Sequence, residues 1–341
     1  MMLTGSLALL GFAITCGLTL VVRRYALATK LLDLPNARSS HSVPTPRGGG
    51  VAIVASLLLF VVLVGTMGVI EGRLVACVLG AGVTVAVLGF LDDRSGLSAR
   101  WRFLGHAVAA IWAIYWIGRI PPMPVFGMEV DLSFAGPALC GLYLVWMVNL
   151  FNFMDGIDGL ASVEAITTTV GGALLWWLAG SGTDWIVALL FASCVGGFLV
   201  WNFPPAKIFM GDAGSGFLGL MVGLLSVWCG QATPHLFWAW LVLVGCFMVD
   251  ATTTLVRRVR RGEKFNEAHR SHAYQYAARK HGSHKIVTVA FGLINLLWLF
   301  PIAALVAMKR LDGLAAVAFS YLPLVWLAFR YKAGARHDQE I

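Results

Sequence analysis

Long apolar runs, separated by short connections that contain charges or Pro and Gly, follow one another along nearly the whole chain. A helix that crosses a bilayer needs about 20 mainly apolar residues, and each run comes near that length. The runs are 3–22, 49–70, 74–91, 103–120, 135–151, 159–179, 185–201, 214–230, 236–255, 286–308 and 313–330. The pattern predicts an all-α, polytopic integral membrane protein of about eleven transmembrane helices, built as a single domain over residues 1–341.

Composition supports this prediction and excludes other classes of protein. Of the 341 residues, 59% are hydrophobic and 12% are charged, against about 25% charged residues in an ordinary soluble domain. A water-soluble globule of this size could not bury so much apolar surface, which excludes a soluble enzyme, a disordered chain and a disulfide scaffold. The six cysteines lie in apolar runs without Cys-x-x-Cys spacing, so we interpret them as small buried hydrophobic residues.

The distribution of Lys and Arg predicts the orientation of the chain. All but four of the 25 basic residues lie in one set of connections and in the carboxyl tail; the four are Arg73, Arg119, Lys309 and Arg310. Because the basic side of a membrane protein faces the cytoplasm, the N-terminus is expected on the periplasmic side and the C-terminus in the cytoplasm. Topology and anionic lipid headgroups therefore explain the net charge of +8, and no nucleic-acid partner is predicted.

Two adjacent acids, Asp92 and Asp93, stand at the inner end of the third apolar run. Neighbouring carboxylates at a membrane boundary are costly because both must be desolvated and they repel one another. Such a pair suits a site that supplies positive charge from Mg²⁺ or basic side chains. The alternative is a solvated loop start in which the pair caps a helix or pairs with Arg94.

A second motif places Asn149, Asn152, Asp155 and Asp158 three residues apart. On a helix this spacing puts the four polar groups roughly on one face. Carboxylate and amide oxygens are the ligands that hard cations prefer, and the glycines that follow each Asp let the backbone approach a ligand. We interpret the motif as functional; the alternative is a helix end at which an Asp caps the next helix.

In a third motif a proline-containing loop brings Asp212 to the start of a glycine-rich helix, within residues 201–216. The N-terminus of a helix, with unpaired N–H groups and small side chains, is suited to hold a phosphate. The alternative is that Asp212 or Ser215 is a simple N-cap and that the glycines only pack helices together.

Two further loops on the same side carry basic residues. Residues 257–285 contain an Arg cluster, which we interpret as ordinary membrane anchoring, followed by His269-Arg270-Ser271-His272. The two histidines at i and i+3 would share one helical face and could contact phosphates or a metal. Residues 33–50 include His41, Arg47 and three glycines, and such a loop can close over an anionic group. We assign no role to His106, His235, His281 and His284.

The motifs fall in predicted cytoplasmic loops at about 23–48, 92–102, 152–158, 202–213 and 257–285. Acids that hold Mg²⁺, with basic groups that neutralise phosphate, are the set needed to transfer a phosphate group. The sequence therefore predicts an active site on the cytoplasmic face. There it would pass a phosphate-linked group from a soluble, nucleotide-linked donor to a lipid acceptor.

The segments LDDRSG, NLFNFMDGIDGLA, IFMGDAGSGFLG, HRSHAYQ and PTPRGG together resemble the polyprenyl-phosphate N-acetylhexosamine-1-phosphate transferases of glycosyltransferase family 4. The resemblance extends from Asp33 to about Gln275 and is greatest to the WecA/WbpL-like branch, which initiates O-antigen synthesis. It implies transfer of a sugar 1-phosphate from a UDP-N-acetylhexosamine to undecaprenyl phosphate, with release of UMP, at the bacterial inner membrane among membrane lipids. Mg²⁺ is the implied cofactor, with Mn²⁺ as a substitute, and a homodimer is left open.

The resemblance also implies roles for residues. Asp92 and Asp93 match the acidic pair that binds or deprotonates the lipid phosphate, and Asp212 matches the metal ligand. The predicted catalytic residues are Asp92, Asp93, Asp155, Asp158, His269, Arg270 and His272. The predicted metal ligand is Asp212, with Asp155 as a second candidate. The predicted nucleotide- or substrate-binding residues are Asn152, Asn202, Phe209, Arg47 and His41.

Two departures from the family pattern narrow the prediction. Gly96 stands where the family often has a third acid, three residues after Asp93. The muramoyl branch has three consecutive histidines where this chain has His-Arg-Ser-His, which disfavours a phospho-muramoyl-pentapeptide transferase. The remaining alternatives are a catalytically inactive scaffold and a transporter or flippase for a lipid-linked or anionic solute. A transporter would place ionisable residues near the bilayer midplane, but the only acids within the apolar runs are Glu164 and Asp250, near the cytoplasmic ends of their runs.

Overall fold

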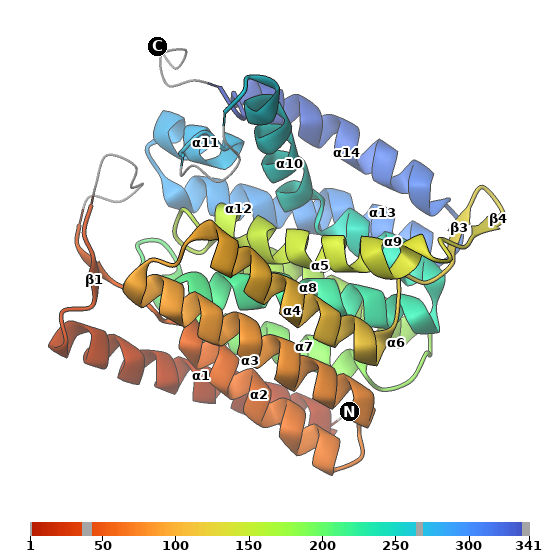
Figure 1. Ribbon diagram of the computed structural model, residues 1–341, viewed down its shortest axis with the longest axis horizontal. Coiled ribbons are helices and arrows are strands. Elements are labelled where there is room, and N and C mark those ends of the chain that lie inside the picture. The colour runs from red at the N-terminus through yellow and green to blue at the C-terminus, as the bar shows by residue number, and fades with distance from the viewer. Residues whose placement is uncertain (1, 36–42, 264–268, 336–341) are drawn as a thin grey trace.

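The computed structural model describes residues 2–35, 43–263 and 269–335, which form a helical bundle with two short hairpins (Figure 1). The helices are α1 Met2–Ala28, α2 Gly50–Thr66, α3 Gly72–Ser95, α4 Ala99–Ile117, α5 Ala135–Met154, α6 Leu160–Leu178, α7 Trp185–Asn202, α8 Asp212–Ala232, α9 Pro234–Leu243, α10 Gly245–Arg260, α11 Ala273–His281, α12 His284–Ile294, the π-helical turn η1 Asn295–Leu299, α13 Phe300–Ala307 and α14 Gly313–Arg330. The antiparallel strand pairs are β1 Leu32–Asp33 with β2 Thr45–Pro46, and β3 Met123–Val125 with β4 Met128–Val130.

The helices of the bundle have the lengths, and its outer surface the apolar side chains, that are typical of a multi-pass membrane protein. Within the described residues, seven helices are long and apolar enough to cross a bilayer, or eight if α9 and α10 count as one bent span. Helices occupy all of the predicted apolar runs, although α2 is shorter than a usual span at 17 residues. Large apolar side chains on the outer helices are exposed, as Leu9 (73%), Tyr115 (77%) and Leu322 (68%) show, and such a surface suits lipid. The count of eleven crossings and the predicted orientation stay predictions.

One predicted span is bent in the structure. The run 236–255 is not a single straight helix, because α9 and α10 meet at an angle of 67°. The break packs against other helices: the Thr168 hydroxyl donates to the Leu243 carbonyl over 3.3 Å, and a Cβ at Gly245 would lie 2.9 Å from the Tyr321 ring. Hydropathy cannot reveal such a break, since both halves are apolar where they join.

Helix α8 is the centre of the bundle. All residues from Ala213 to Gly230 are buried, and α8 packs against α2, α3, α5, α6 and α9. Glycines allow this close packing: a Cβ at Gly50 would overlap the backbone of Gly214, and one at Gly89 would lie 2.5 Å from the backbone of Asp212. The N-terminus of α8 is therefore held tightly between α2 and α3.

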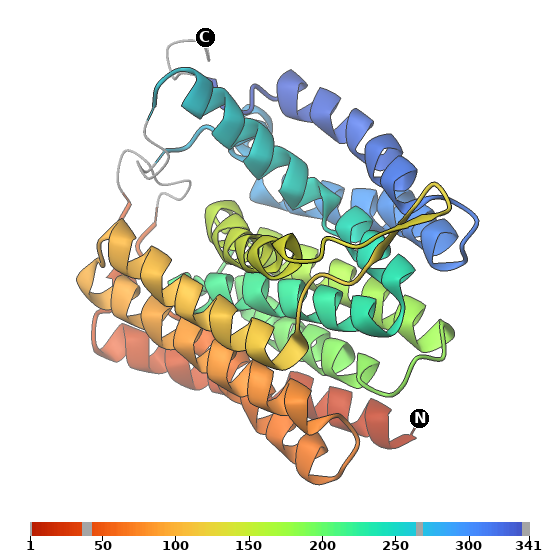
Figure 2. The ribbon, with the colours of Figure 1, turned by 45° about the vertical axis from the view of Figure 1, so that its right-hand side comes forward.

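The connections that carry the sequence motifs lie at one end of the bundle. In Figures 1 and 2, the β1 region, the end of α3, the connection from α5 to α6, the start of α8 and α11 lie at this end. The β3–β4 hairpin lies at the opposite end. Residues separated by much of the chain are thereby brought together.

We expect Gly50→Ala to destabilise the protein and Gly72→Ala to leave its stability unchanged or slightly raised. The methyl group at position 50 would overlap the α8 backbone, and overpacking of this kind costs about 1–3 kcal/mol. Gly72 is also at the start of a helix, but a Cβ there has no neighbour within 4 Å among the described residues. Thermal unfolding in detergent measures both effects, and equal Tm values for the two variants would contradict the close packing of α2 against α8.

Candidate active site

The start of α8 places Asp212 at the centre of the site. Gly211 precedes the helix with φ 78°, a left-handed conformation that favours glycine, and a Cβ there would lie 2.7 Å from the Asp93 carboxylate. The Asn152 amide donates to Asp212 Oδ1 over 2.8 Å and to Ser215 Oγ over 3.2 Å. Asn152 therefore fixes the orientation of the Asp212 carboxylate.

The adjacent acids of α3 have different partners. Asp93 Oδ2 accepts a long 3.4 Å hydrogen bond from the Ala213 N–H at the first turn of α8. Arg47 Nη1 lies 3.9 Å from Asp93 Oδ1, and Arg47 Nη2 donates a hydrogen bond to the backbone carbonyl of Asp93. Asp92 instead forms an ion pair with Arg102 on α4, in which Asp92 Oδ2 lies 2.9 Å from Arg102 Nη1. The positive charge beside the pair thus comes from two separate elements.

The expected single-face arrangement of residues 149–158 is wrong beyond Met154. Helix α5 ends at Met154 and α6 begins at Leu160, so Asp155 and Asp158 lie in the connection between them. Asp158 Oδ2 accepts a 2.9 Å hydrogen bond from the Ala206 N–H, and Oδ1 lies 3.2 Å from His284 Nδ1. The three-residue spacing brings these acids to the site as loop residues and not as a helical stripe.

Asn202 braces two loops of the site. Its Oδ1 accepts from the Gly159 N–H and its Nδ2 donates to the Ile208 carbonyl, both over 3.0 Å, and the residue is buried. The neighbouring Phe209 N–H donates to the Pro46 carbonyl over 2.8 Å, which joins this loop to β2. Asn202 and Phe209 both line a cavity of the site, although both ends of the Asn202 amide are already engaged within the protein.

Two cavities meet at Asp212. The first, which we call the polar cavity, has a volume of about 240 Å³. Its lining includes Arg47, Asp93, Asp155, Asp158, Phe209 and His284. The second, which we call the apolar cavity, has a volume of about 380 Å³ and is walled mainly by apolar side chains. Its lining includes Val85, Leu88, Phe103 and Val148, with Asp92, Arg102, His106 and His272 at its polar side. Asp212, Gly156 and Gln275 line both cavities.

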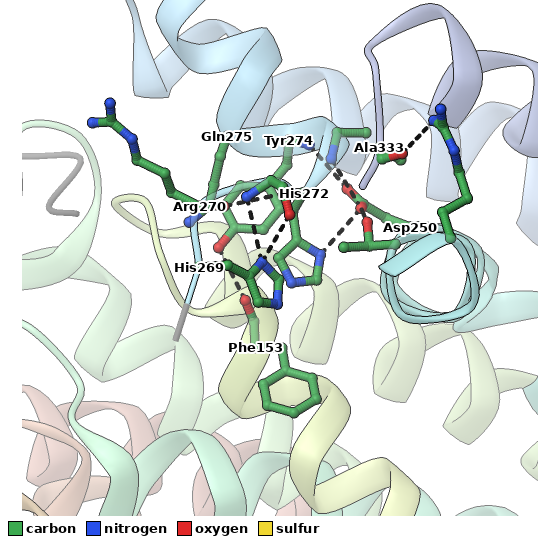
Figure 3. Close-up of polar contacts among 12 residues, drawn as sticks. Phe153, Asp250, His269, Arg270, His272, Tyr274, Gln275 and Ala333 are labelled. Carbon is green, nitrogen blue, oxygen red and sulfur yellow. Dashed lines mark hydrogen bonds and ion pairs between the residues drawn. The ribbon is translucent and has the colours of Figure 1, made fainter. Parts of the chain in front are cut away.

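The histidines of the fourth motif lie before a helix and not on it. Helix α11 begins at Ala273, so the expectation that His269 and His272 share a helical face is wrong, yet their rings stack with centroids 5.0 Å apart. Both line the apolar cavity. The Arg270 side chain extends away from the two imidazole rings (Figure 3).

The polar cavity concentrates negative charge. Burial, together with the charges of Asp212, Asp93 and Asp158, raises the pKa of Asp155 well above its usual range. A bound cation would relieve this repulsion.

The donor atoms around Asp212 fit Mg²⁺ without forming a complete cage. Among the described residues, no three His, Cys, Asp or Glu side chains converge as ligands of one ion. Mg²⁺ is usually held by one or two carboxylates together with substrate phosphates and several waters. Asp212, with Asp155 or Asp93 beside it, therefore fits a metal that is completed by substrate.

Several residues of the site were not predicted from the sequence. Arg102 was attributed to topology and His106 and His284 were assigned no role, but all three line the cavities. Nothing in the sequence signalled them, because α4 and α12, which carry these three side chains, contain none of the motifs. Arg258, attributed to membrane anchoring, is buried and pairs with Glu263 at 2.8 Å. His41 lies outside the described residues.

A model of glycosyl transferase family 4 matches residues 75–230. A probable undecaprenyl-phosphate N-acetylglucosaminyl 1-phosphate transferase of Bacillus subtilis (strain 168) is 30% identical over 296 residues, which cover 85% of this chain and 80% of that protein. An undecaprenyl-phosphate alpha-N-acetylglucosaminyl 1-phosphate transferase of Thermotoga maritima is 30% identical over 285 residues, which cover 83% of this chain and 86% of that protein. A phospho-N-acetylmuramoyl-pentapeptide-transferase of Moorella thermoacetica is 36% identical, but over 42% of this chain and 49% of that protein.

The apolar helices and these similarities define a multi-pass membrane enzyme that transfers a sugar 1-phosphate. The chain belongs to glycosyl transferase family 4, among the polyprenyl-phosphate N-acetylhexosamine-1-phosphate transferases. The transporter and inactive-scaffold alternatives are therefore set aside.

We expect acidification to destabilise the wild-type protein more than His269→Gln. Burial, with help from His272 and Arg258, lowers the pKa of His269 to about 3. The unfolded chain would bind a proton at this histidine below about pH 6.5, whereas the folded protein binds it only near pH 3. Stability should therefore fall between pH 7 and pH 5. Thermal melts across pH 5–8 measure the difference; the curves should run parallel above pH 7, and equal slopes below it would contradict a neutral His269.

Proposed function

We propose that this protein transfers an N-acetylhexosamine 1-phosphate from a UDP-sugar to undecaprenyl phosphate and releases UMP. The reaction would take place at the cytoplasmic face of the bacterial inner membrane and initiate O-antigen or a related surface glycan in lipopolysaccharide synthesis. The observation that carries the proposal is that a polar and an apolar cavity meet at Asp212. A soluble donor and a lipid acceptor need sites of these two kinds that share a reaction centre.

The apolar cavity suits the acceptor. Val85, Leu88 and Val148 offer apolar contact to the first isoprene units of a polyprenyl chain. Phe103 in the same wall is 60% exposed, so the cavity continues onto the outer surface of the bundle where lipid would lie. Arg102, held by Asp92 at 2.9 Å, supplies positive charge for the lipid phosphate at the polar side.

The polar cavity suits the nucleotide donor. Phe209 offers a ring against which a uracil base can stack. The guanidinium of Arg47 lies beside Asp93 at the start of α8, where helix N–H groups also favour negative charge. A diphosphate that extends from this cavity towards Asp212 would reach the boundary with the acceptor.

Mg²⁺ would be held by Asp212, with Asp155 or Asp93 and the donor diphosphate completing its ligands. When bound, it would neutralise negative charge on the diphosphate oxygens, including those on the phosphorus under attack. Asn152 keeps the Asp212 carboxylate oriented by its 2.8 Å hydrogen bond. The high pKa of Asp155 would fall once positive charge enters the cavity.

In the net reaction, a phosphate oxygen of undecaprenyl phosphate forms a bond to the sugar-linked phosphorus of the donor. The bond from that phosphorus to the bridging oxygen breaks, and UMP leaves with the electron pair. Phosphoryl transfer of this kind depends mainly on positioning and on charge neutralisation. Arg102 and His272 on the acceptor side and Arg47 on the donor side would provide both.

We expect purified protein with undecaprenyl phosphate, Mg²⁺ and a UDP-N-acetylhexosamine to release UMP and form an undecaprenyl-diphosphate sugar. UDP-N-acetylglucosamine is the first donor to test, because the relatives from B. subtilis and T. maritima are named for N-acetylglucosamine. UMP is measured by chromatography and the lipid product by mass spectrometry. A screen of all available UDP-N-acetylhexosamines that yields no UMP would refute the proposal.

We expect Asp212→Asn to lower turnover at least about 100-fold, because a charged group at the reaction centre is lost. The variant should melt no lower than wild type without metal, since it relieves repulsion among the acids. It should also lose the rise in Tm that Mg²⁺ and donor together give the wild-type protein. Glu129→Gln, at an exposed acid of β4 at the other end of the bundle, should leave both properties unchanged. A wild-type Tm shift in Asp212→Asn would remove Asp212 from the metal site.

A further inference from the structure

A buried acid of α10 lies behind the His-Arg-Ser-His motif. Asp250 is 4% exposed, and the bend between α9 and α10 directs its helix towards α11. Its Oδ1 lies 3.2 Å from His272 Nδ1 and accepts from the Ala273 N–H over 3.0 Å, while Oδ2 accepts from the Tyr274 N–H over 2.9 Å. Figure 3 shows the Asp250 carboxylate facing both the His272 ring and the first turn of α11.

These contacts give Asp250 two tasks at once. The first N–H groups of a helix lack partners within the helix, and here a carboxylate from another helix serves two of them. The same carboxylate also contacts ring nitrogen Nδ1 of His272, which is the residue at the N-cap position of α11. The start of α11 and the imidazole are therefore held by one group.

The contact determines which nitrogen of His272 faces the apolar cavity. A carboxylate only accepts hydrogen bonds, so a hydrogen bond across this 3.2 Å contact requires the hydrogen on Nδ1 and leaves Nε2 to meet a ligand. His272 lines the apolar cavity, and its ring is packed near those of His269 and Tyr274, at centroid distances of 5.0 and 5.5 Å. Both the ring plane and the tautomer are thus set before a substrate arrives.

We propose that Asp250 is a positioning residue that acts through His272, holding its Nδ1–H so that Nε2 is directed at the phosphate groups that meet beside Asp212. This role rests on the proposed function. Asp250 touches no substrate itself; it keeps His272 in one tautomer and one orientation. A helix cap alone would need only the two N–H contacts.

The first test is a double-mutant cycle of Asp250→Asn and His272→Gln, with turnover measured as UMP release. Asp250→Asn should lower kcat about 10- to 100-fold, the usual effect of losing a partner that orients an active-site ligand, with a smaller change in KM for the UDP-sugar. In the His272→Gln background the same substitution should cost less than about threefold, because nothing is left to position. Equal costs in both backgrounds would overturn the proposal.

Thr254→Val is the matched control. The Thr254 hydroxyl donates to Asp250 Oδ1 over 3.2 Å within α10, so this variant removes a contact of Asp250 without touching His272. Its kcat should stay within about twofold of wild type. A loss as large as that of Asp250→Asn would show that any disturbance of α10 has the same effect, and would overturn the assignment to His272.

The second test observes the wild-type protein and does not depend on turnover. ¹⁵N NMR of histidine-labelled protein in detergent, with the His272 signals assigned by comparison with His272→Gln, should show the Nδ1–H tautomer for neutral His272. The Nε2–H tautomer would overturn the proposal. If the tautomer is as expected but no UDP-sugar releases UMP, the proposed function fails while the contact between Asp250 and His272 stands.

Discussion

Negative charge held close to hydrocarbon is the constraint on which the rest of this structure depends. Asp93, Asp155 and Asp212 gather around the start of α8, where each would repel the others. The protein offsets part of this cost with oriented donors, which are the Asn152 amide, the N–H groups at the start of α8 and the Arg47 guanidinium. The remaining deficit of positive charge is what makes the site suited to a cation and a diphosphate.

The site depends on the close approach of the α2 and α3 backbones to the first turn of α8. Gly50 and Gly89 let α2 and α3 meet α8 at its first turn, and Gly211 admits the Asp93 carboxylate beside it. Small residues at helix contacts are a general means of packing helices in membranes, where lipid gives little hydrophobic drive for association. In this protein the same contacts also determine where Asp212 stands relative to the two cavities.

A second layer of contacts orients the groups that face those cavities. Asn202 joins the loop after α5 to the loop after α7, and His284 from α12 meets Asp158. Arg102 holds Asp92 from α4. Asp92 and Asp158 are thus tied to two different helices, so their geometry depends on the assembly of the bundle.

The sequence alone predicted a helical membrane protein, the family, and the motif residues that line the two cavities, because apolar run length and clustered acids are local properties of the chain. It predicted wrongly that the helical face of Asn149 and Asn152 continues to Asp155 and Asp158 and that His269 and His272 share a helical face, since a three-residue spacing does not show where a helix begins or ends. It also missed Arg102, His284 and the partner of His272. Only the tertiary structure decided these, because each depends on a contact between two separate elements, and hydropathy records how apolar a segment is but not which neighbour it meets.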